Sequence, residues 1–153
     1  MSTQISYEQF LEGFRNTIVT AKARLENIPE EQSRRKISAD DWAPIEVIGH
    51  LIDSAANNHQ RFMRLQLQTE ISLPGYDQDN WVRLNRYQHE PWAEIIALWS
   101  VYNRHLVSVI ESLDDSALGH VWHSPEGDVT LEFIASDYVR HVKHHLAQIG
   151  IQG

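Results

Sequence analysis

The stretch PIEVIGHLIDSAANNHQRFMRLQLQ, residues 44–68, decides the fold, because its apolar residues recur every three or four positions. That spacing gathers them on one face of an α-helix, and Pro44 suits a first helical turn, where its missing N–H is not needed. We expect Asp40 or Asp41 to cap the free N–H groups of this turn. A helix with one apolar face has to bury that face against other elements. The apolar stripe consists of Ile45, Ile48, Leu51, Ile52, Ala55, Phe62 and Met63.

Three further segments show the same periodicity, at about residues 7–28, 91–113 and 130–149. The first stops before Pro29 and the last stops at Gly150, and both residue types commonly follow the end of a helix. Four helices of about twenty residues each are long enough to share one core.

The segments between the predicted helices are polar and rich in turn residues. Residues 30–41 are typical of a loop, and residues 69–90 form a long connection that we expect to hold a short helix around residues 81–87. Residues 114–128 are turn-rich, and the apolar piece 120–123 is too isolated to predict a strand. The sequence therefore predicts an all-α fold, an antiparallel four-helix bundle with a long crossover connection between helices two and three.

The composition indicates one domain, residues 1–153. Hydrophobic residues make up 42% of the chain, and 13 basic against 21 acidic residues give a net charge of −8. This charge has the wrong sign for binding nucleic acid or an anionic membrane. The absence of cysteine excludes disulfides and thiolate metal sites. No secretory signal, membrane-spanning run, glycine-rich phosphate loop, Gly-x-Ser-x-Gly elbow or His-Glu-x-x-His motif is visible, and we expect a cytoplasmic protein.

Histidine is the unusual residue, with nine copies, and three of them lie close together in the last helical segment. His141 and His145 lie about 40° apart on one face of that helix, whereas His144 falls toward solvent. Two imidazoles one turn apart can chelate a single metal ion. The alternative is a histidine-rich exposed helix end, where basic side chains suit the negative end of the helix dipole.

A third ligand has to come from elsewhere in the chain, and periodicity leaves the choice open. On the helix predicted for residues 44–68, His59 lies within the apolar stripe, where a lone histidine is commonly a core residue. His50 lies in a polar stripe, which can line a cleft between helices. The other members of that polar stripe are Glu46, Asp53, Ser54, Asn57 and Arg61. The remaining candidate ligands are His89, His105, His120 and His123.

Two motifs resemble signatures of the DinB-like, or YfiT-like, metal-binding family. WAPIEVIGHLIDS at residues 42–54 is similar to the second-helix signature of that family, and His141-x-x-x-His145-x-x-Gln148-Ile149 is similar to its C-terminal signature. The stretch HSPEGDVTL at residues 123–131 also resembles the family in its order of residue types. Two more stretches are similar to the YfiT-type branch in particular, Arg61-Phe62 and Pro74-Gly75-Tyr76 with Trp81. The resemblance covers most of the chain from Trp42 onward.

This resemblance implies a four-helix bundle in which His50, His141 and His145 hold one divalent ion. Imidazole donors suit Zn, Ni, Cu or Fe, and we expect Zn or Ni. Members of the family are described as metal-dependent hydrolases, isomerases or thiol transferases that use bacillithiol, mycothiol or glutathione. Many are dimers, and others have no assigned activity. The YfiT branch often has a further histidine after the Asp-Ser pair, where this chain has Ala55. We therefore expect a small-molecule substrate, a low-molecular-weight thiol as a candidate co-substrate, and a homodimer.

Further side chains are candidates for the chemistry around such an ion. Asp137 precedes His141 by one turn and Gln148 follows His145 by three residues, so either is placed to orient a ligand ring. Asp137 is also a candidate catalytic carboxylate.

Glu46 and two aromatic residues complete the set of candidates. Glu46, one turn before His50, is either a general base or an acid that serves the first turn of its helix. Tyr76 and Trp81, in the long connection, are candidates for the wall of a substrate pocket.

Three classes of function follow from these observations. The first is a metal-dependent enzyme, a hydrolase or thiol S-transferase, whose three-histidine site activates water or a small thiol. The second is a divalent-metal-binding or stress-related module without catalysis, which would bind metal and show no turnover. The third is a plain helical interaction protein, which would carry no metal when purified without a histidine tag.

Overall fold

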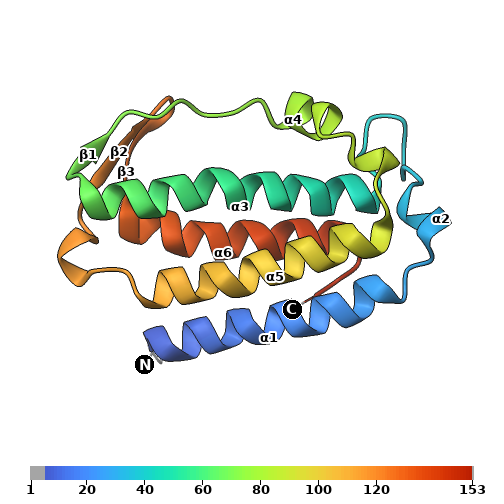
Figure 1. Ribbon diagram of the computed structural model, residues 1–153, viewed down its shortest axis with the longest axis horizontal. Helices are drawn as coiled ribbons and strands as arrows, with labels where there is room; N and C mark the ends of the chain where they lie inside the picture. Colours follow the sequence, from blue (N-terminus) through green and yellow to red (C-terminus); the bar gives the residue numbers. More distant parts are fainter. Residues whose placement is uncertain (1–5, 153) are drawn as a thin grey trace.

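Four long helices form a bundle in the computed structural model of the chain, which describes residues 6–152 (Figure 1). Each helix begins and ends within two residues of the predicted positions, and the predicted four-helix bundle is confirmed. Within the described residues, no helix is long and apolar enough to cross a membrane. The four helices are α1 (Tyr7–Glu26), α3 (Pro44–Leu67), α5 (Trp92–Glu111) and α6 (Leu131–Gln148).

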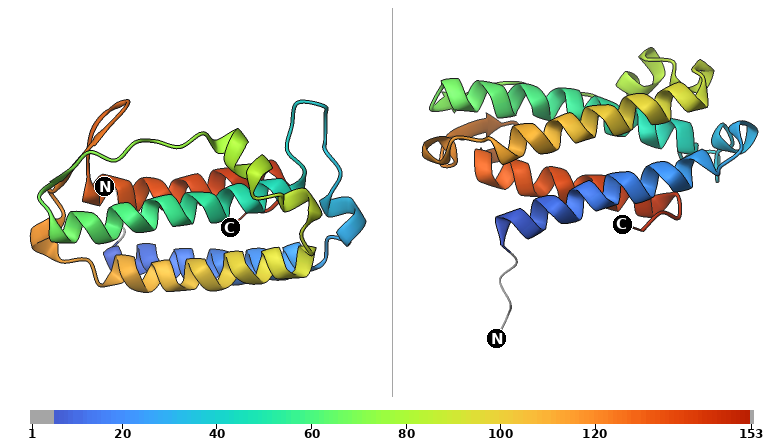
Figure 2. Two further views of the ribbon diagram at one scale, coloured as in Figure 1. Left: turned by 45° about the horizontal axis from the view of Figure 1, so that its top comes forward. Right: turned by 60° about the horizontal axis from the view of Figure 1, so that its bottom comes forward.

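The long crossover determines how the helices run relative to one another. The chain leaves the end of α3, returns along the outside of the bundle and starts α5 beside the start of α3, so α3 and α5 are parallel (Figures 1 and 2). α1 and α6 run the opposite way. α3 packs against both α5 and α6, and α1 packs against α5. The pairs α1–α5 and α3–α6 are therefore antiparallel, as the sequence predicts for a bundle.

Local capping explains where the helices begin. Ser6 and Gln9 form a reciprocal capping box at α1, with the Gln9 N–H donating to Ser6 Oγ over 3.2 Å. At α3 the expected cap by Asp40 or Asp41 is wrong. The residue before Pro44 is Ala43, and its N–H donates to Glu46 Oε1 over 3.1 Å. Asp41 instead accepts a hydrogen bond from the Ser38 hydroxyl.

One apolar core joins the four helices. Tyr138 of α6 lies at its centre, with its ring edge-to-face against Phe14 of α1 and Phe62 of α3 at centroid distances of 6.2 and 5.9 Å. Its hydroxyl donates to Asn103 Oδ1 of α5, so the buried polar atom is satisfied. The same residue therefore contacts all three of the other long helices.

A small three-stranded sheet closes one end of the bundle, and the expectation that residues 120–123 form no strand is wrong. The strands are β1 (Glu70–Ile71), β2 (Val121–Ser124) and β3 (Gly127–Thr130), in the order β1-β2-β3. β1 pairs parallel to β2, and β2 pairs antiparallel to β3. Gly127 has φ +127°, a conformation that favours glycine, at the hairpin turn.

Short helices occupy the connections. The expected helix around residues 81–87 is α4 (Gln78–Leu84), followed by the 3₁₀ turn η1 (Tyr87–His89). The segment predicted as a loop, residues 30–41, contains one helical turn, α2 (Glu30–Ser33), and a second 3₁₀ turn, η2 (Asp115–Ala117), precedes the sheet.

The crossover docks on α3 through a glycine. A Cβ atom at Gly49 would lie 2.1 Å from Cδ2 of Tyr87, so only glycine lets this ring lie against the helix. The Tyr87 hydroxyl then donates to Asp53 Oδ1 over 2.7 Å, and the Asn85 amide donates to the same oxygen over 2.9 Å. Burial raises the pKa of Asp53 to about 6. These contacts hold the crossover to the half of α3 that carries His50.

Candidate metal centre

Three imidazoles from two helices meet between α3 and α6. His50 lies in the second turn of α3 and is fully buried, and His141 and His145 lie one turn apart on α6. His141 Nε2 lies 3.4 Å from His50 Nε2 and 3.0 Å from His145 Nε2. One ring nitrogen from each of the three lies within 4.8 Å of the other two. The structure thus brings together the three residues that the resemblance implies.

The donor set fits a divalent cation. A neutral imidazole has one N–H and one lone pair, so three ring nitrogens that converge on one point cannot all be satisfied by donating to one another. A tetrahedral ion with metal–nitrogen distances of about 2.0–2.1 Å holds neighbouring nitrogens about 3.3 Å apart. The two separations of 3.0 and 3.4 Å that involve His141 match this spacing.

Burial keeps the three rings neutral at physiological pH. Burial, together with the nearby His145 and His141, lowers the pKa of His50 to about 3. Burial and the nearby His145, against an opposing effect of Asp137, lower the pKa of His141 to about 4. The pKa of His145 is also lowered by burial, against the effect of its hydrogen bond to Gln148. Neutral imidazole is the form that binds a metal ion.

Neighbouring side chains orient two of the rings. Gln148 Oε1 lies 2.8 Å from His145 Nδ1, which is the contact that the spacing on α6 predicts. Because the amide oxygen can only accept, His145 Nδ1 carries the proton and Nε2 carries the lone pair. The Ser54 hydroxyl lies 3.5 Å from His141 Nδ1.

Sequence reasoning missed Trp42 and Ser54 as parts of the site. The Trp42 ring packs on His50 at a centroid distance of 4.8 Å and lies 6.5 Å from the His145 ring. It thus covers the rings from the loop that precedes α3. Ser54 follows His50 by one helical turn, and that spacing is the signal that could have identified it.

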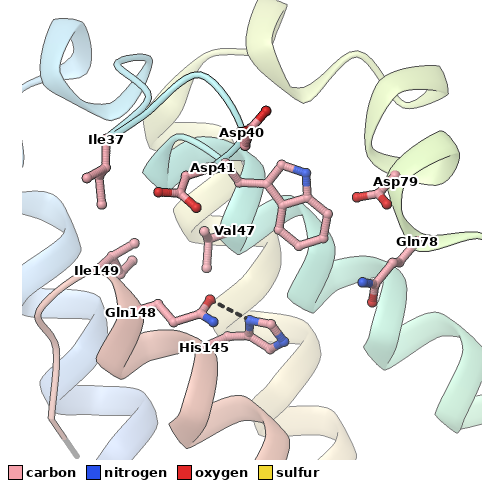
Figure 3. Close-up of a pocket in the computed structure, with 10 residues that line it drawn as sticks. Ile37, Asp40, Asp41, Val47, Gln78, Asp79, His145, Gln148 and Ile149 are labelled. Carbon is pink, nitrogen blue, oxygen red and sulfur yellow. Dashed lines mark hydrogen bonds between the residues drawn. The ribbon is translucent and has the colours of Figure 1, made fainter.

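Two cavities adjoin the rings from different sides. The first, of about 440 Å³, is lined by His145, Trp42 and Gln148 and has an acidic rim of Asp40, Asp41 and Asp79. Figure 3 shows the His145–Gln148 hydrogen bond at its floor and the carboxylates of the rim around it.

The second cavity, of about 690 Å³, is lined by His141 and extends under the crossover to the β2–β3 hairpin. Gln78 of α4 lines both cavities. The centre is therefore reached from two sides, one with an acidic rim and one whose lining contains both acidic and basic side chains.

The two aromatic residues of the crossover have different positions. Tyr76 lines the larger cavity together with His141, as expected for a pocket wall. Trp81 stands behind it, edge-to-face at a centroid distance of 5.3 Å, and lines a separate hollow on the far side of Tyr76. Trp81 therefore supports the wall rather than forming part of the larger cavity.

The two candidate catalytic carboxylates also differ. Glu46 is buried and accepts hydrogen bonds from the Ala43 N–H and from the Gln88 side chain over 3.1 and 3.0 Å. These partners correspond to the second of the two predicted roles, an acid that serves the first turn of α3. Asp137 lines the larger cavity beside His141 and forms an ion pair with Arg140 at 2.7 Å.

Two of the other candidate histidines, His59 and His120, have partners of their own, and His89 lies in η1, outside the cluster. His59 Nδ1 lies 2.9 Å from the Tyr102 hydroxyl, and its ring packs against His105. His120 Nδ1 lies 2.6 Å from the Leu65 carbonyl oxygen. His144 is exposed, as the helical spacing predicts.

His123 belongs to the sheet. It lies between Asp128 and Glu70 at 2.8 and 3.1 Å, and its hydrogen bonds to these two acids raise its pKa above the ordinary value. Its partners therefore tie β2 to both neighbouring strands rather than to the three rings.

Comparison with known proteins identifies relatives of this chain. A family model described as the DinB superfamily matches residues 14–149. A protein of Bacillus mycoides is 23% identical over 126 residues, which is 82% of this chain and 72% of the relative, and is named as an inferred metal-dependent hydrolase. A protein of Bacillus thuringiensis with the same inferred name matches with the same identity and coverage.

Two solved structures share the fold. YfiT from Bacillus subtilis, described as an inferred metal-dependent hydrolase with an unusual four-helix bundle topology, matches with a TM-score of 0.78 and 24% identity. The match covers 97% of this chain and 88% of YfiT. A mycothiol-dependent maleylpyruvate isomerase matches with a TM-score of 0.76 and 13% identity, over 94% of this chain and 60% of that protein.

Proposed function

Because this chain belongs to the DinB superfamily, we propose that it is a metal-dependent enzyme in which His50, His141 and His145 hold one divalent ion, Zn or Ni. The observation that carries the proposal is the convergence of three neutral ring nitrogens on one point beside an open cavity. The proposed reaction uses water or a small thiol as nucleophile. The names of the relatives support both options, since some are inferred hydrolases and one structural neighbour depends on mycothiol.

The residues of the site have separate tasks in this proposal. His50, His141 and His145 would hold the ion through neutral imidazoles, and a bound ion would supply Lewis-acid chemistry that lowers the pKa of water or a thiol or polarises a carbonyl group. Gln148 fixes the proton of His145 on Nδ1, and so leaves the lone pair on Nε2, the nitrogen that would hold the ion. Trp42 covers the His50 ring and keeps bulk water from it.

The larger cavity receives the substrate. Tyr76 forms part of its wall, and Asp137 is the carboxylate that we propose accepts a proton from the nucleophile. The ion pair with Arg140 holds that carboxylate beside His141.

The test is elemental analysis of protein purified without a histidine tag. We expect about one divalent ion per chain in the wild type, and loss of the ion in His50→Ala, His141→Ala and His145→Ala, because each substitution removes one of three donors. His144→Ala is the matched control, since this residue is exposed on the same helix and should leave the metal content unchanged.

Full metal content in His141→Ala or His145→Ala would overturn the ligand assignment. Turnover is then measured with panels of esters, amides and thiol acceptors. Stoichiometric metal with no turnover on any panel would favour a metal-binding protein without catalysis.

A further inference from the structure

The larger cavity contains a buried cation next to the proposed metal centre. Arg61 of α3 lines this cavity, and the residue is only 8% exposed. Among the described residues, no carboxylate lies within ion-pair distance of its guanidinium group. A charge removed from water is costly unless it is paired, and arginine stays charged in proteins. The cavity therefore contains a buried positive charge that no carboxylate of residues 6–152 pairs with.

Neighbouring side chains hold the guanidinium group in one orientation. Its central carbon lies 3.8 Å from the centroid of the Trp122 ring, so the planar cation stacks on the indole. Nη1 donates to Asn58 Oδ1 over 3.2 Å. A guanidinium group has five N–H donors, and this contact uses one of them. A stacked, hydrogen-bonded guanidinium that lines a cavity is a preorganised fork for a planar anion.

The same face of α3 connects this cation to the metal centre. Asn58 also donates to the Ser54 hydroxyl over 3.3 Å, and that hydroxyl lies 3.5 Å from His141 Nδ1. His50, Ser54, Asn58 and Arg61 follow one another at spacings of three and four residues, so they form one ridge along the helix. The ridge runs from a proposed ligand at one end to the free cation at the other.

The other charged groups of the cavity are two ion pairs and Glu126, which is exposed on the hairpin turn and lies outside ion-pair distance of Arg61. Arg140 pairs with Asp137 at 2.7 Å, and Asp128 pairs with His123 at 2.8 Å. Both pairs are also far more exposed than Arg61, with 69% of the Arg140 side chain accessible. The lining also contains Trp122, Tyr76 and Ile134, which offer apolar surface. A volume of about 690 Å³ is enough for a small organic molecule.

We propose that Arg61 binds a carboxylate group of the substrate, and that the substrates are small organic acids whose reacting group extends along the α3 ridge to the three histidines. The inference rests on the proposed function for the reacting end of the substrate, but the anchor itself is independent of the ion. Carboxylate is the preferred anion because its two oxygens match the fork of the guanidinium group. The apolar walls suit the carbon skeleton of such an acid.

The test is isothermal titration calorimetry of the full chain with benzoate and succinate, and with the neutral amides benzamide and succinamide. Each titration is run on zinc-loaded and on EDTA-treated protein. We expect the wild type to bind at least one acid at least tenfold more tightly than its amide, with or without zinc. Arg61→Gln should weaken acid binding at least tenfold and leave zinc content unchanged, and Arg61→Lys should give an intermediate loss, because it keeps the charge without the fork.

Arg64→Gln is the matched control, since Arg64 follows Arg61 by one turn on α3 but is exposed and lies outside this cavity, and it should change acid binding less than twofold. Melting curves establish that each variant is folded, and Arg61→Lys keeps the test valid if Arg61→Gln does not fold.

Three results would overturn the anchor: equal acid binding by Arg61→Gln and wild type, equal binding of acid and amide, or no binding of either acid by the wild type. Acid binding that needs zinc and ignores Arg61 would place the carboxylate on the ion. That outcome rejects Arg61 as the anchor and keeps the proposed metal-dependent enzyme. Conversely, a protein that binds no zinc but still binds the acid through Arg61 would keep the anchor and reject the proposed metal centre.

Discussion

At the scale of single residues, the proposed centre depends on which nitrogen of each ring carries the proton. His145 is the ring for which the structure answers this, because its Nδ1 faces the acceptor oxygen of Gln148 at 2.8 Å. Without that acceptor the ring can rotate or change tautomer, and Nε2 is then directed at the other two histidines only part of the time.

Gln148→Leu should therefore weaken metal binding about 10–100-fold, because a half-buried ligand ring loses the group that orients it. The measurement is competition for zinc against a chromophoric chelator. Gln148→Glu is the comparison variant, since a carboxylate also accepts from Nδ1, and its affinity should stay near that of the wild type. Equal affinities for the leucine variant and the wild type would show that Gln148 has no orienting role.

The sequence identified two of the three clustered histidines from helical spacing, and left the third open for a physical reason. α6 has one buried face, so the angle between His141, His145 and the apolar stripe was informative. α3 packs against both α5 and α6, and a helix with two buried faces gives no unique inward direction. His59 faces Tyr102 and His105 of α5, whereas His50 faces α6, and only the resemblance distinguished the two.

At the scale of secondary-structure elements, the long helices were predictable and the sheet was not. A helix is specified by contacts within about four residues, which the sequence displays directly. β1 and β2 pair Glu70 with Val121, so the information for this pairing is spread over distant parts of the chain. The docking of η1 on α3 could not be predicted for the same reason, because nothing near Gly49 in the sequence indicates that Tyr87 covers it.

Gly49→Ala tests that docking. An added methyl would overlap the Tyr87 ring, and forced overpacking costs about 1–3 kcal/mol, which exceeds the gain of about 0.5–1 kcal/mol from replacing a helical glycine. We expect a lower free energy of unfolding in chemical denaturation. Gly13→Ala in α1 is the matched control, because a Cβ there meets nothing within 4 Å, and it should raise the stability by about 0.5–1 kcal/mol. The same sign for both variants would contradict the close packing of Tyr87 on α3.

At the scale of the whole molecule, the proposed centre joins two helices that are distant in sequence. His50 and His141 are 91 positions apart, and they meet only when α3 and α6 are packed against each other. An ion held by both helices binds the folded chain in preference to the unfolded one, so it should stabilise the bundle.

Zinc at 100 times its dissociation constant should therefore add about 2.7 kcal/mol to the free energy of unfolding, or roughly 5–10 °C to the melting temperature of a chain of this size. Calorimetry or circular dichroism, with and without EDTA, measures the shift. His141→Ala should lose it, and His144→Ala should keep it. A melting temperature that EDTA leaves unchanged in metal-loaded wild type would argue against an ion held between the two helices.

The proposed ligands and the walls of the larger cavity come from different kinds of segment. The histidines stand on two long helices, whereas Tyr76 and Trp122 stand on the crossover and the hairpin, which are connections between helices. Mutations that lengthen or rewrite those connections can change which molecules enter without moving an imidazole. Such a division lets natural variation retune substrate choice while the reactive chemistry is inherited intact, and it makes the connecting segments the first place to introduce diversity in a directed-evolution library.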